Sequence, residues 1–228
     1  MGESDLELER LLERAGVQRS IAKPLARYGA FVLEANRSLN LTGAKTSAEL
    51  ADHLLDSLSV VPFVSGRYID VGSGAGFPGV PVAIASALPV TFVEATAKKA
   101  RFLESVLETF GLGGTVVAER AETAAHRLEL RERFACATAR AVNSAPAVAE
   151  LVLPFLEVGG AAILQRGAFS VEERRSLEDA CLVLGGELES ERKLGEMRRI
   201  ILVRKVRRTS ARFPRRVGVP AKRPLCSP

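Results

Sequence analysis

Apolar positions at the start of the chain recur with a helical period. Residues 6–15 and 24–39 place leucine, valine and other apolar side chains three or four positions apart among charged ones, which predicts two amphipathic helices. A third helix is expected over residues 47–61, after a polar loop, and Pro62 ends it. Residues 1–62 are therefore expected to form an N-terminal helical extension.

From residue 68 onward the pattern changes to short apolar runs separated by helical stretches. The predicted strands cover residues 68–71, 90–93, 115–118, 134–142, 161–165 and 199–205. The predicted helices between them cover residues 79–87, 96–112, 144–156 and 171–184. This alternation predicts an α/β domain over residues 63–206, with a doubly wound, mostly parallel sheet and an antiparallel edge.

Length and composition fit one globular α/β protein. The chain has 228 residues, of which 47% are hydrophobic, enough for a sizeable core. It contains no apolar run long enough to span a membrane, and residues 1–14 lack the apolar core of a signal peptide. We therefore expect a cytoplasmic protein with no membrane partner, and we expect a monomer.

The cysteines and histidines do not form a metal-binding pattern. Cys136, Cys181 and Cys226 are scattered without a C-x-x-C pair, and the two histidines, His53 and His126, are far apart in the sequence. The sequence therefore predicts neither a metal site nor a disulfide framework.

Charge is distributed unevenly along the chain. Residues 192–228 contain thirteen Lys or Arg and a single acid, whereas residues 1–191 contain 19 basic and 26 acidic residues. Positive charge gathered at one end favours a nucleic-acid partner, because each phosphate that a cation neutralises releases counterions. The alternative for the tail, residues 207–228, is a solvated disordered segment.

Three glycines at alternate positions follow the first predicted strand. Gly72, Gly74 and Gly76 would let the backbone take positive φ and approach a ligand closely before the next helix begins. Asp70 and Glu94 end the two flanking strands, at the edge where open α/β sheets bind ligands. Because a carboxylate at Glu94 can accept both ribose hydroxyls of an adenosine, the pattern predicts an adenosine-containing ligand.

Spacing within the glycine motif selects among such ligands. A dinucleotide fingerprint, G-x-G-x-x-G, needs a glycine where this chain has Phe77, and its third glycine admits a pyrophosphate. The form D-x-G-x-G-x-G is instead that of S-adenosylmethionine-dependent methyltransferases, whose cofactor has no phosphate. NAD or flavin binding, and a turn shaped for purely structural reasons, are the alternatives. The expected architecture is then the seven-stranded, Rossmann-like sheet of class I methyltransferases.

The end of the fourth predicted strand limits the acceptor. Methyltransferases of exocyclic amines usually carry Asn or Asp before Pro-Pro-aromatic there, whereas this chain continues A-R-A-V-N-S from Ala139 to Ser144. A ring nitrogen such as guanine nitrogen 7 has a free lone pair and no proton, so its methylation needs no general base. Alignment of donor and acceptor and exclusion of water can then supply much of the rate.

Four sequence motifs stand in a fixed order along the chain: N-x-x-x-N-L-T at Asn36–Thr42, H-L-L-D-S-L at His53–Leu58, D-V-G-S-G-A-G-F-P-G-V-P at Asp70–Pro81, and F-P-R-R-V-G-V-P-A-K-R-P-L at Phe213–Leu225. With these motifs the sequence resembles the RsmG (GidB) family of bacterial 16S ribosomal RNA guanine-7 methyltransferases. The glycine motif is specific only to the methyltransferase superfamily. The other three are specific to this family, and the likeness extends from about residue 25 to the C-terminus.

The resemblance implies roles for individual residues. Gly72, Gly74 and Phe77 would line the methionine end of S-adenosyl-L-methionine, Glu94 would bind its ribose, and Ala121 and Glu122 would lie near its adenine. Asp70 is also expected among the cofactor-binding residues. Arg140 would stand at the junction of cofactor and substrate, pairing with the methionine carboxylate or an RNA phosphate. An ion pair of Arg140 with Asp70 or Glu94 is its structural alternative.

Further residues are implied at the RNA side. Asn40 would join Arg140 as a catalytic residue by hydrogen-bonding the guanine, while His53 and Asp56, on one face of their helix, would shape the mouth of the active site; taken alone, that pair is more often structural. The cations expected at phosphates are Arg166, Arg198, Arg215, Arg216, Lys222 and Arg223. Arg166 and Arg199 replace the Lys and His that are usual in the family, which keeps a positive charge but changes its geometry at Arg166.

The sequence thus predicts an S-adenosylmethionine-dependent methyltransferase of a guanine in 16S ribosomal RNA, acting on the RNA or the small subunit. Two alternatives stay open: a methyltransferase of a small molecule or protein, for which the basic tail would be incidental, and an RNA-binding cofactor sensor without turnover.

Overall fold

The computed structural model describes residues 2–140, 143–196 and 198–226. Within these ranges the chain forms a seven-stranded sheet with the strand order β3-β2-β1-β4-β5-β7-β6. The strands are β1 (Tyr68–Val71), β2 (Val90–Val93), β3 (Gly114–Val117), β4 (Phe134–Arg140), β5 (Leu156–Arg166), β6 (Gly186–Leu194) and β7 (Arg198–Lys205). The first five are parallel, and β7 runs antiparallel to both β5 and β6, so the predicted doubly wound sheet with an antiparallel edge is confirmed.

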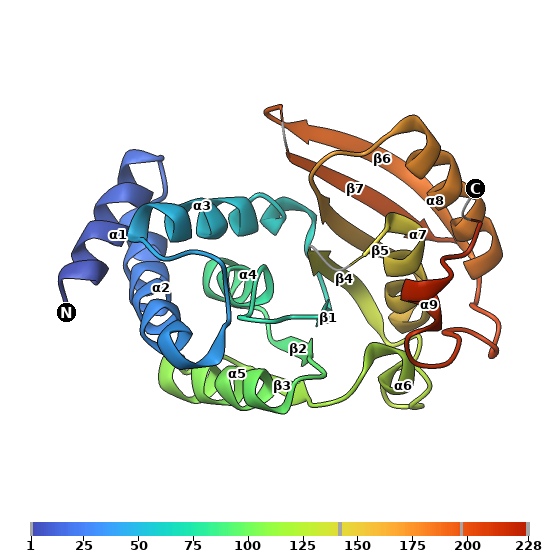
Figure 1. Ribbon diagram of the computed structural model, residues 1–228, viewed down its shortest axis with the longest axis horizontal. Helices are drawn as coiled ribbons and strands as arrows, with labels where there is room; N and C mark the ends of the chain where they lie inside the picture. Colours follow the sequence, from blue (N-terminus) through green and yellow to red (C-terminus); the bar gives the residue numbers. More distant parts are fainter. Residues whose placement is uncertain (1, 141–142, 197, 227–228) are drawn as a thin grey trace.

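Helices cover both faces of the sheet, and further helices lie beyond it at one end of the molecule (Figure 1). They are α1 (Glu3–Arg14), α2 (Arg19–Leu39), α3 (Ser47–Leu58), α4 (Gly79–Ser86), α5 (Ala97–Phe110), α6 (Ala121–Ala124), α7 (Ala145–Val152), α8 (Val171–Leu184) and α9 (Val219–Lys222). Short 3-10 turns follow α3 at Val61–Phe63 and α7 at Leu153–Phe155. The N-terminal helices lie at one end of the molecule and the C-terminal tail at the other.

Two hydrophobic cores sandwich the sheet. Successive side chains of β1 face opposite sides, because side chains alternate along a strand: Tyr68 belongs to the core beneath α1–α5, whereas Ile69 belongs to the core beneath α6–α8. The first core joins Leu8 and Leu25 of the N-terminal helices to Phe92 of β2. The helical extension therefore shares its core with the sheet.

The sequence prediction was wrong about some elements. It assigned no strand to residues 186–194, because β6 is an edge strand whose charged side chains leave no clear apolar face. The helix expected from Pro24 begins at Arg19 and keeps Pro24 inside it. The strand expected over 134–142 is seen to Arg140, and its last two positions, 141–142, lie outside the described residues.

No helix among the described residues is both long enough and apolar enough to cross a membrane. These residues also contain no group of three or more His, Cys, Asp or Glu side chains placed to hold a metal ion.

Candidate functional site

The glycine turn between β1 and α4 has the conformation that its sequence predicts. Gly72, Gly74 and Gly76 have φ values of 74°, 57° and 98°, which L side chains adopt only with strain. A Cβ atom built on Gly74 would have no neighbour closer than 4.0 Å, the carbonyl oxygen of Gly72. Open space therefore lies beside the backbone at this position, where a ligand can approach.

Glu94 stands at the end of β2 with its carboxylate turned to the glycine turn. Its side chain is 8% exposed. Oε2 accepts a hydrogen bond from the backbone N–H of Gly74 at 2.9 Å, and Oε1 accepts one from the N–H of Thr96 at 2.7 Å. Because each carboxylate oxygen has two lone-pair directions, both oxygens keep acceptor capacity for a ligand.

Asp70, the last residue but one of β1, is a fully buried carboxylate. Its Oδ1 accepts a hydrogen bond from Thr138 Oγ1 at 2.6 Å, while Oδ2 has no hydrogen-bond partner among the described residues. Burial raises the pKa of Asp70 to about 6. The side chain lies behind the start of α4, since a Cβ on Gly79 would be 2.9 Å from its Oδ2.

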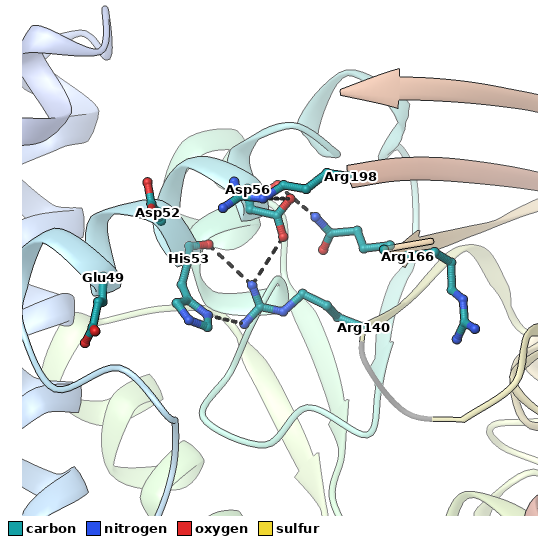
Figure 2. A pocket seen from close by; sticks show the side chains of 9 residues that line it. Glu49, Asp52, His53, Asp56, Arg140, Arg166 and Arg198 are labelled. Carbon is teal, nitrogen blue, oxygen red and sulfur yellow. Dashed lines mark hydrogen bonds and ion pairs between the residues drawn. The ribbon is translucent and has the colours of Figure 1, made fainter. Parts of the chain in front are cut away.

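A cavity of about 450 Å³ opens between α3, the carboxyl ends of β4 and β5, and the start of β7. Figure 2 shows the side chains that line it. They are Glu49, Asp52, His53, Asp56, Arg140, Gln165, Arg166 and Arg198, together with the backbone of Gly167. The structure thus brings together five residues that the sequence singled out: His53, Asp56, Arg140, Arg166 and Arg198.

Arg140 is the centre of this cluster. Its guanidinium lies 3.5 Å from Asp56 Oδ2 and 3.2 Å from His53 Nδ1, and Figure 2 shows it pointing at both side chains. The side chains of Arg140 and Asp56 are each only 16% exposed. The ion pair of Arg140 is therefore with Asp56 on α3, and not with Asp70 or Glu94 as the structural alternative proposed.

His53 accepts a hydrogen bond from Arg140 at Nδ1. Burial and the neighbouring charge of Arg140 lower its pKa, against the opposing effect of Asp56. A neutral ring with its proton on Nε2 can accept the Arg140 hydrogen bond at Nδ1. The His53–Asp56 motif therefore serves to hold Arg140.

Phe77 connects the glycine turn to the cavity. The guanidinium carbon of Arg140 lies 4.9 Å from the centre of the Phe77 ring, and the His53 ring lies 5.9 Å from it. Phe77 follows the last glycine of the turn directly. The predicted cofactor turn and the predicted substrate mouth thus meet at one side chain.

The other cations of the cavity differ in how they are held. Arg198 is 45% exposed and its Nε lies 4.0 Å from Asp56 Oδ1. Arg166 pairs with Glu173 and donates to the carbonyl of Asn143, and Figure 2 shows its guanidinium pointing away from the Arg140 cluster.

Gln165 lines the same cavity, although the sequence gave no reason to select it. Its Nε2 donates to the backbone carbonyl of Asp56 at 2.8 Å, which ties β5 to α3. Gln165 and Arg140 are register partners on β5 and β4. The sequence shows only a glutamine at the end of a predicted strand. Its contact with α3 becomes visible only in the structure.

Asn40 lies apart from this group. It ends α2 in a left-handed conformation and lines a separate cavity of about 840 Å³ between α1, α2 and the loop that precedes α3. Asn36 of the same motif fixes that loop: its Oδ1 accepts from the N–H of Leu41 at 2.7 Å, and its Nδ2 donates to the carbonyl of Thr42 at 2.9 Å.

The C-terminal tail is folded against the second core. Glu122 of α6, expected near the adenine with Ala121, is buried and accepts the N–H of Gly218 at 2.9 Å. Arg215 forms an ion pair of 2.6 Å with Glu150, whose side chain is fully buried in α7. Arg216 and Lys222, in contrast, are exposed.

The comparisons with known proteins agree in one assignment. The family described as rRNA small subunit methyltransferase G (GidB) matches residues 21–202. The "Ribosomal RNA small subunit methyltransferase G" of Trichormus variabilis is 42% identical over 85% of this chain and 86% of its own. The protein of the same name from Rubrobacter xylanophilus is 41% identical over 95% of this chain and 89% of its own.

Similar solved structures are more distant in sequence. An O-methyltransferase from Bacillus cereus, solved with SAH, has a TM-score of 0.57 and 18% identity, covering 78% of this chain and 91% of its own. A putative RNA methyltransferase from Pyrococcus horikoshii has a TM-score of 0.53 and 15% identity, covering 78% and 96%. At these identities the likeness shows the fold.

Proposed function

Because the chain belongs to the rRNA small subunit methyltransferase G family, we propose that its glycine turn binds S-adenosyl-L-methionine and that the adjoining cavity receives the target guanine of 16S ribosomal RNA. The protein is an S-adenosylmethionine-dependent methyltransferase of small-subunit ribosomal RNA, and its product is guanine methylated at ring nitrogen 7. The observation that carries the proposal is the position of Phe77, which belongs to the turn and contacts Arg140 and His53 of the cavity.

The residues around the turn fit this cofactor. The backbone is open beside Gly74, so a ligand can lie directly against it. Glu94 offers a buried carboxylate that is oriented by two backbone N–H groups and can accept the ribose hydroxyls. The ring of Phe77 gives the methionine end an apolar neighbour.

Methyl transfer to guanine nitrogen 7 requires alignment of the methyl donor with the ring nitrogen, and it requires no general base. S-adenosyl-L-methionine supplies, when bound, a methyl group on a positively charged sulfur. Guanine nitrogen 7 carries a lone pair and no proton, so no side chain has to remove one. His53 agrees with this, because its Nδ1 lone pair is occupied by Arg140. The walls of the cavity hold the base out of its stack and exclude water.

Arg140 positions charge where cofactor and RNA meet. Its guanidinium is fixed by Asp56 and His53 and lies over the Phe77 ring, so few rotamers remain to be lost on binding. It can donate to the methionine carboxylate or to an RNA phosphate, and such charge-assisted bonds are strong and directional.

The RNA around the target base contacts further cations besides Arg140. Arg198 and Arg166 line the cavity, and Arg216 and Lys222 are exposed on the tail. Asn40 and Arg223 remain candidates for RNA contact from the loop before α3 and from the tail. We assign Arg215 chiefly to the fold, because it neutralises the buried Glu150. The protein acts as a monomer in the cytoplasm, on 16S RNA within or outside the small subunit.

Transfer of labelled methyl tests the proposal. Deproteinised 16S RNA and small subunits from cells that lack the activity are incubated with the enzyme and labelled S-adenosyl-L-methionine, and the nucleosides are then analysed. We expect label as 7-methylguanosine in at least one substrate, and its loss in Glu94→Ala and Arg140→Ala. Arg101→Ala, at an exposed position on α5, is the matched control.

Results that contradict the proposal would also distinguish among the alternative functions. Label in another nucleoside would refute the guanine assignment. No label in either RNA, although S-adenosylhomocysteine binds, would instead favour a methyltransferase of another substrate or a cofactor sensor. Stabilisation by NAD or FAD in place of S-adenosylhomocysteine would overturn the cofactor itself.

A further inference from the structure

A side chain of the N-terminal helices reaches into the glycine turn. Tyr28 of α2 is completely buried, and its hydroxyl donates a hydrogen bond of 2.5 Å to the backbone carbonyl of Ala75. Ala75 lies between Gly74 and Gly76, in the middle of the turn. Other contacts of the turn, such as those with Glu94 and with the carbonyl of Val93, come from the neighbouring strand β2. The Tyr28 contact links it to a helix 47 positions earlier in the chain.

The ring of Tyr28 also supports the residue that joins the turn to the cavity. Its centre lies 5.6 Å from that of Phe77 in an edge-to-face arrangement, and 6.0 Å from that of Phe110 on α5. Phe77 is therefore in contact with Tyr28 as well as with Arg140 and His53. A change in the position of Tyr28 would move the Phe77 ring, which contacts the two cavity residues.

Gly76 shows how closely the two parts approach. A Cβ at this position would lie 2.9 Å from the Tyr28 hydroxyl and 2.6 Å from a methyl group of Val80, and φ is +98°. Position 76 therefore requires a glycine because the Tyr28 hydroxyl and Val80 leave no space for a side chain, and because of its positive φ. Burial raises the pKa of Tyr28 well above its usual value, so the hydroxyl keeps its proton and remains a donor.

We propose that Tyr28 is a positioning residue of the methyltransferase: its bond to Ala75 and its contact with Phe77 fix the glycine turn for S-adenosyl-L-methionine, which makes the N-terminal helices a working part of the cofactor site. This inference rests on the proposed function of the turn. Tyr28 contacts the turn through the backbone carbonyl of Ala75, so it acts on the cofactor site through the backbone.

The variant Tyr28→Phe removes one hydroxyl and keeps the ring. We expect the affinity for S-adenosylhomocysteine, measured by calorimetry, to fall about tenfold, because the Ala75 carbonyl loses its buried donor and the turn relaxes. The KM for S-adenosyl-L-methionine should rise by a similar factor, while kcat at saturating cofactor changes little. The control is Thr209→Val, which removes a buried hydroxyl that donates to the Leu184 carbonyl and accepts from Lys205 Nζ, with no contact to the turn among its hydrogen bonds. It should lower the melting temperature without changing the affinity.

Two outcomes would overturn the inference. One is a Tyr28→Phe protein that binds S-adenosylhomocysteine as the wild type does; the other is an equal loss of affinity in Thr209→Val. Absence of binding in the wild type would instead refute the proposed cofactor, so the two failures are distinguishable.

A measurement on the wild type covers the case in which Tyr28→Phe does not fold. Amide exchange is followed with and without S-adenosylhomocysteine. We expect slower exchange in the glycine turn and also in the part of α2 around Tyr28. Protection of the turn without any change in α2 would contradict the coupling.

Discussion

At the scale of single residues, the guanidinium of Arg140 is held in place but keeps N–H donors for a ligand. Asp56 and His53 hold its guanidinium, yet a planar group with five N–H donors has more hydrogen bonds to give than these two partners take up. The site therefore resembles a preorganised donor, whose orientation is set before the ligand arrives. A lysine at this position would keep the charge but could not fill the same geometry.

Replacing Arg140 tests this interpretation. Loss of a hydrogen bond to a charged group costs about 1.5–3 kcal/mol, so we expect Arg140→Ala to lower kcat/KM by about 10- to 100-fold. Arg140→Lys should recover only part of that loss. Steady-state methylation of 16S RNA or small subunits measures both, with Arg101→Ala as the reference. Full activity in Arg140→Lys would show that charge alone suffices.

His53 gives a prediction about pH. Its pKa is lowered by burial and by Arg140, so the folded protein holds this proton more weakly than the unfolded chain, with a usual value of about 6.5. The stability that His53 contributes is complete above that value and is lost as the pH falls below it. Protonation would also place two positive charges side by side, so activity should fall together with the neutral fraction of His53.

Proton NMR can follow this group directly, because the chain has two histidines and His126→Gln leaves one signal. We expect the pKa of His53 to lie below about 6.5 in that background and to rise when Arg140→Ala is added. An unchanged or lower pKa in the double variant would contradict the contact between the two side chains.

At the scale of elements, the tail is fastened to the domain by buried polar groups. Glu150 is fully buried on α7. The Arg215 guanidinium forms a bidentate contact with its carboxylate, and the backbone N–H of Arg215 donates a further hydrogen bond to Oε1. Arg131 adds bonds to the carbonyls of Phe213, Thr209 and Ser210. A deletion of the whole tail would therefore test folding as much as RNA binding.

Arg215→Ala should destabilise the protein strongly. Removing one partner leaves the Glu150 carboxylate buried without a counter-charge, which costs about 3–5 kcal/mol. The double variant Glu150→Gln with Arg215→Ala should recover part of this loss, because the remaining group is neutral. Urea unfolding measures both free energies. If Arg215→Ala leaves stability unchanged and weakens only RNA binding, our structural assignment of Arg215 is wrong.

The elements also show why some features could be predicted and others could not. The glycine turn, Asp70 and Glu94 follow from local sequence, since strand ends and alternate glycines lie where any doubly wound sheet would place them. β6 was missed because an edge strand of alternating charges has no apolar period. Tyr28 and Gln165 were missed because each acts through a partner far away in the chain, Ala75 and Asp56. Helical spacing predicted the helix over residues 24–39 but did not single out Tyr28.

At the scale of the whole molecule, positive charge is concentrated in the last part of the chain. The first 191 residues are acidic overall, and the basic residues gather after position 191. In the structure several of these late cations are used internally, as Arg199 with Glu191 and Arg204 with Glu189. Counting basic residues in the sequence therefore overstates the charge that is available to RNA.

The exposed cations give the last prediction. Binding of small subunits or 16S RNA should weaken as salt rises, with a slope of log K against log salt of about 0.7–0.9 per phosphate contact. Substituting Arg216 and Lys222 together by Ala should lower the magnitude of that slope by about 1.4–1.8 and weaken binding, because two phosphate contacts are lost. Affinity for S-adenosylhomocysteine should stay unchanged, since both side chains are exposed on the tail. Equal slopes for the wild type and the double variant would place the RNA contacts elsewhere, and Arg198 at the cavity would be the next cation to replace.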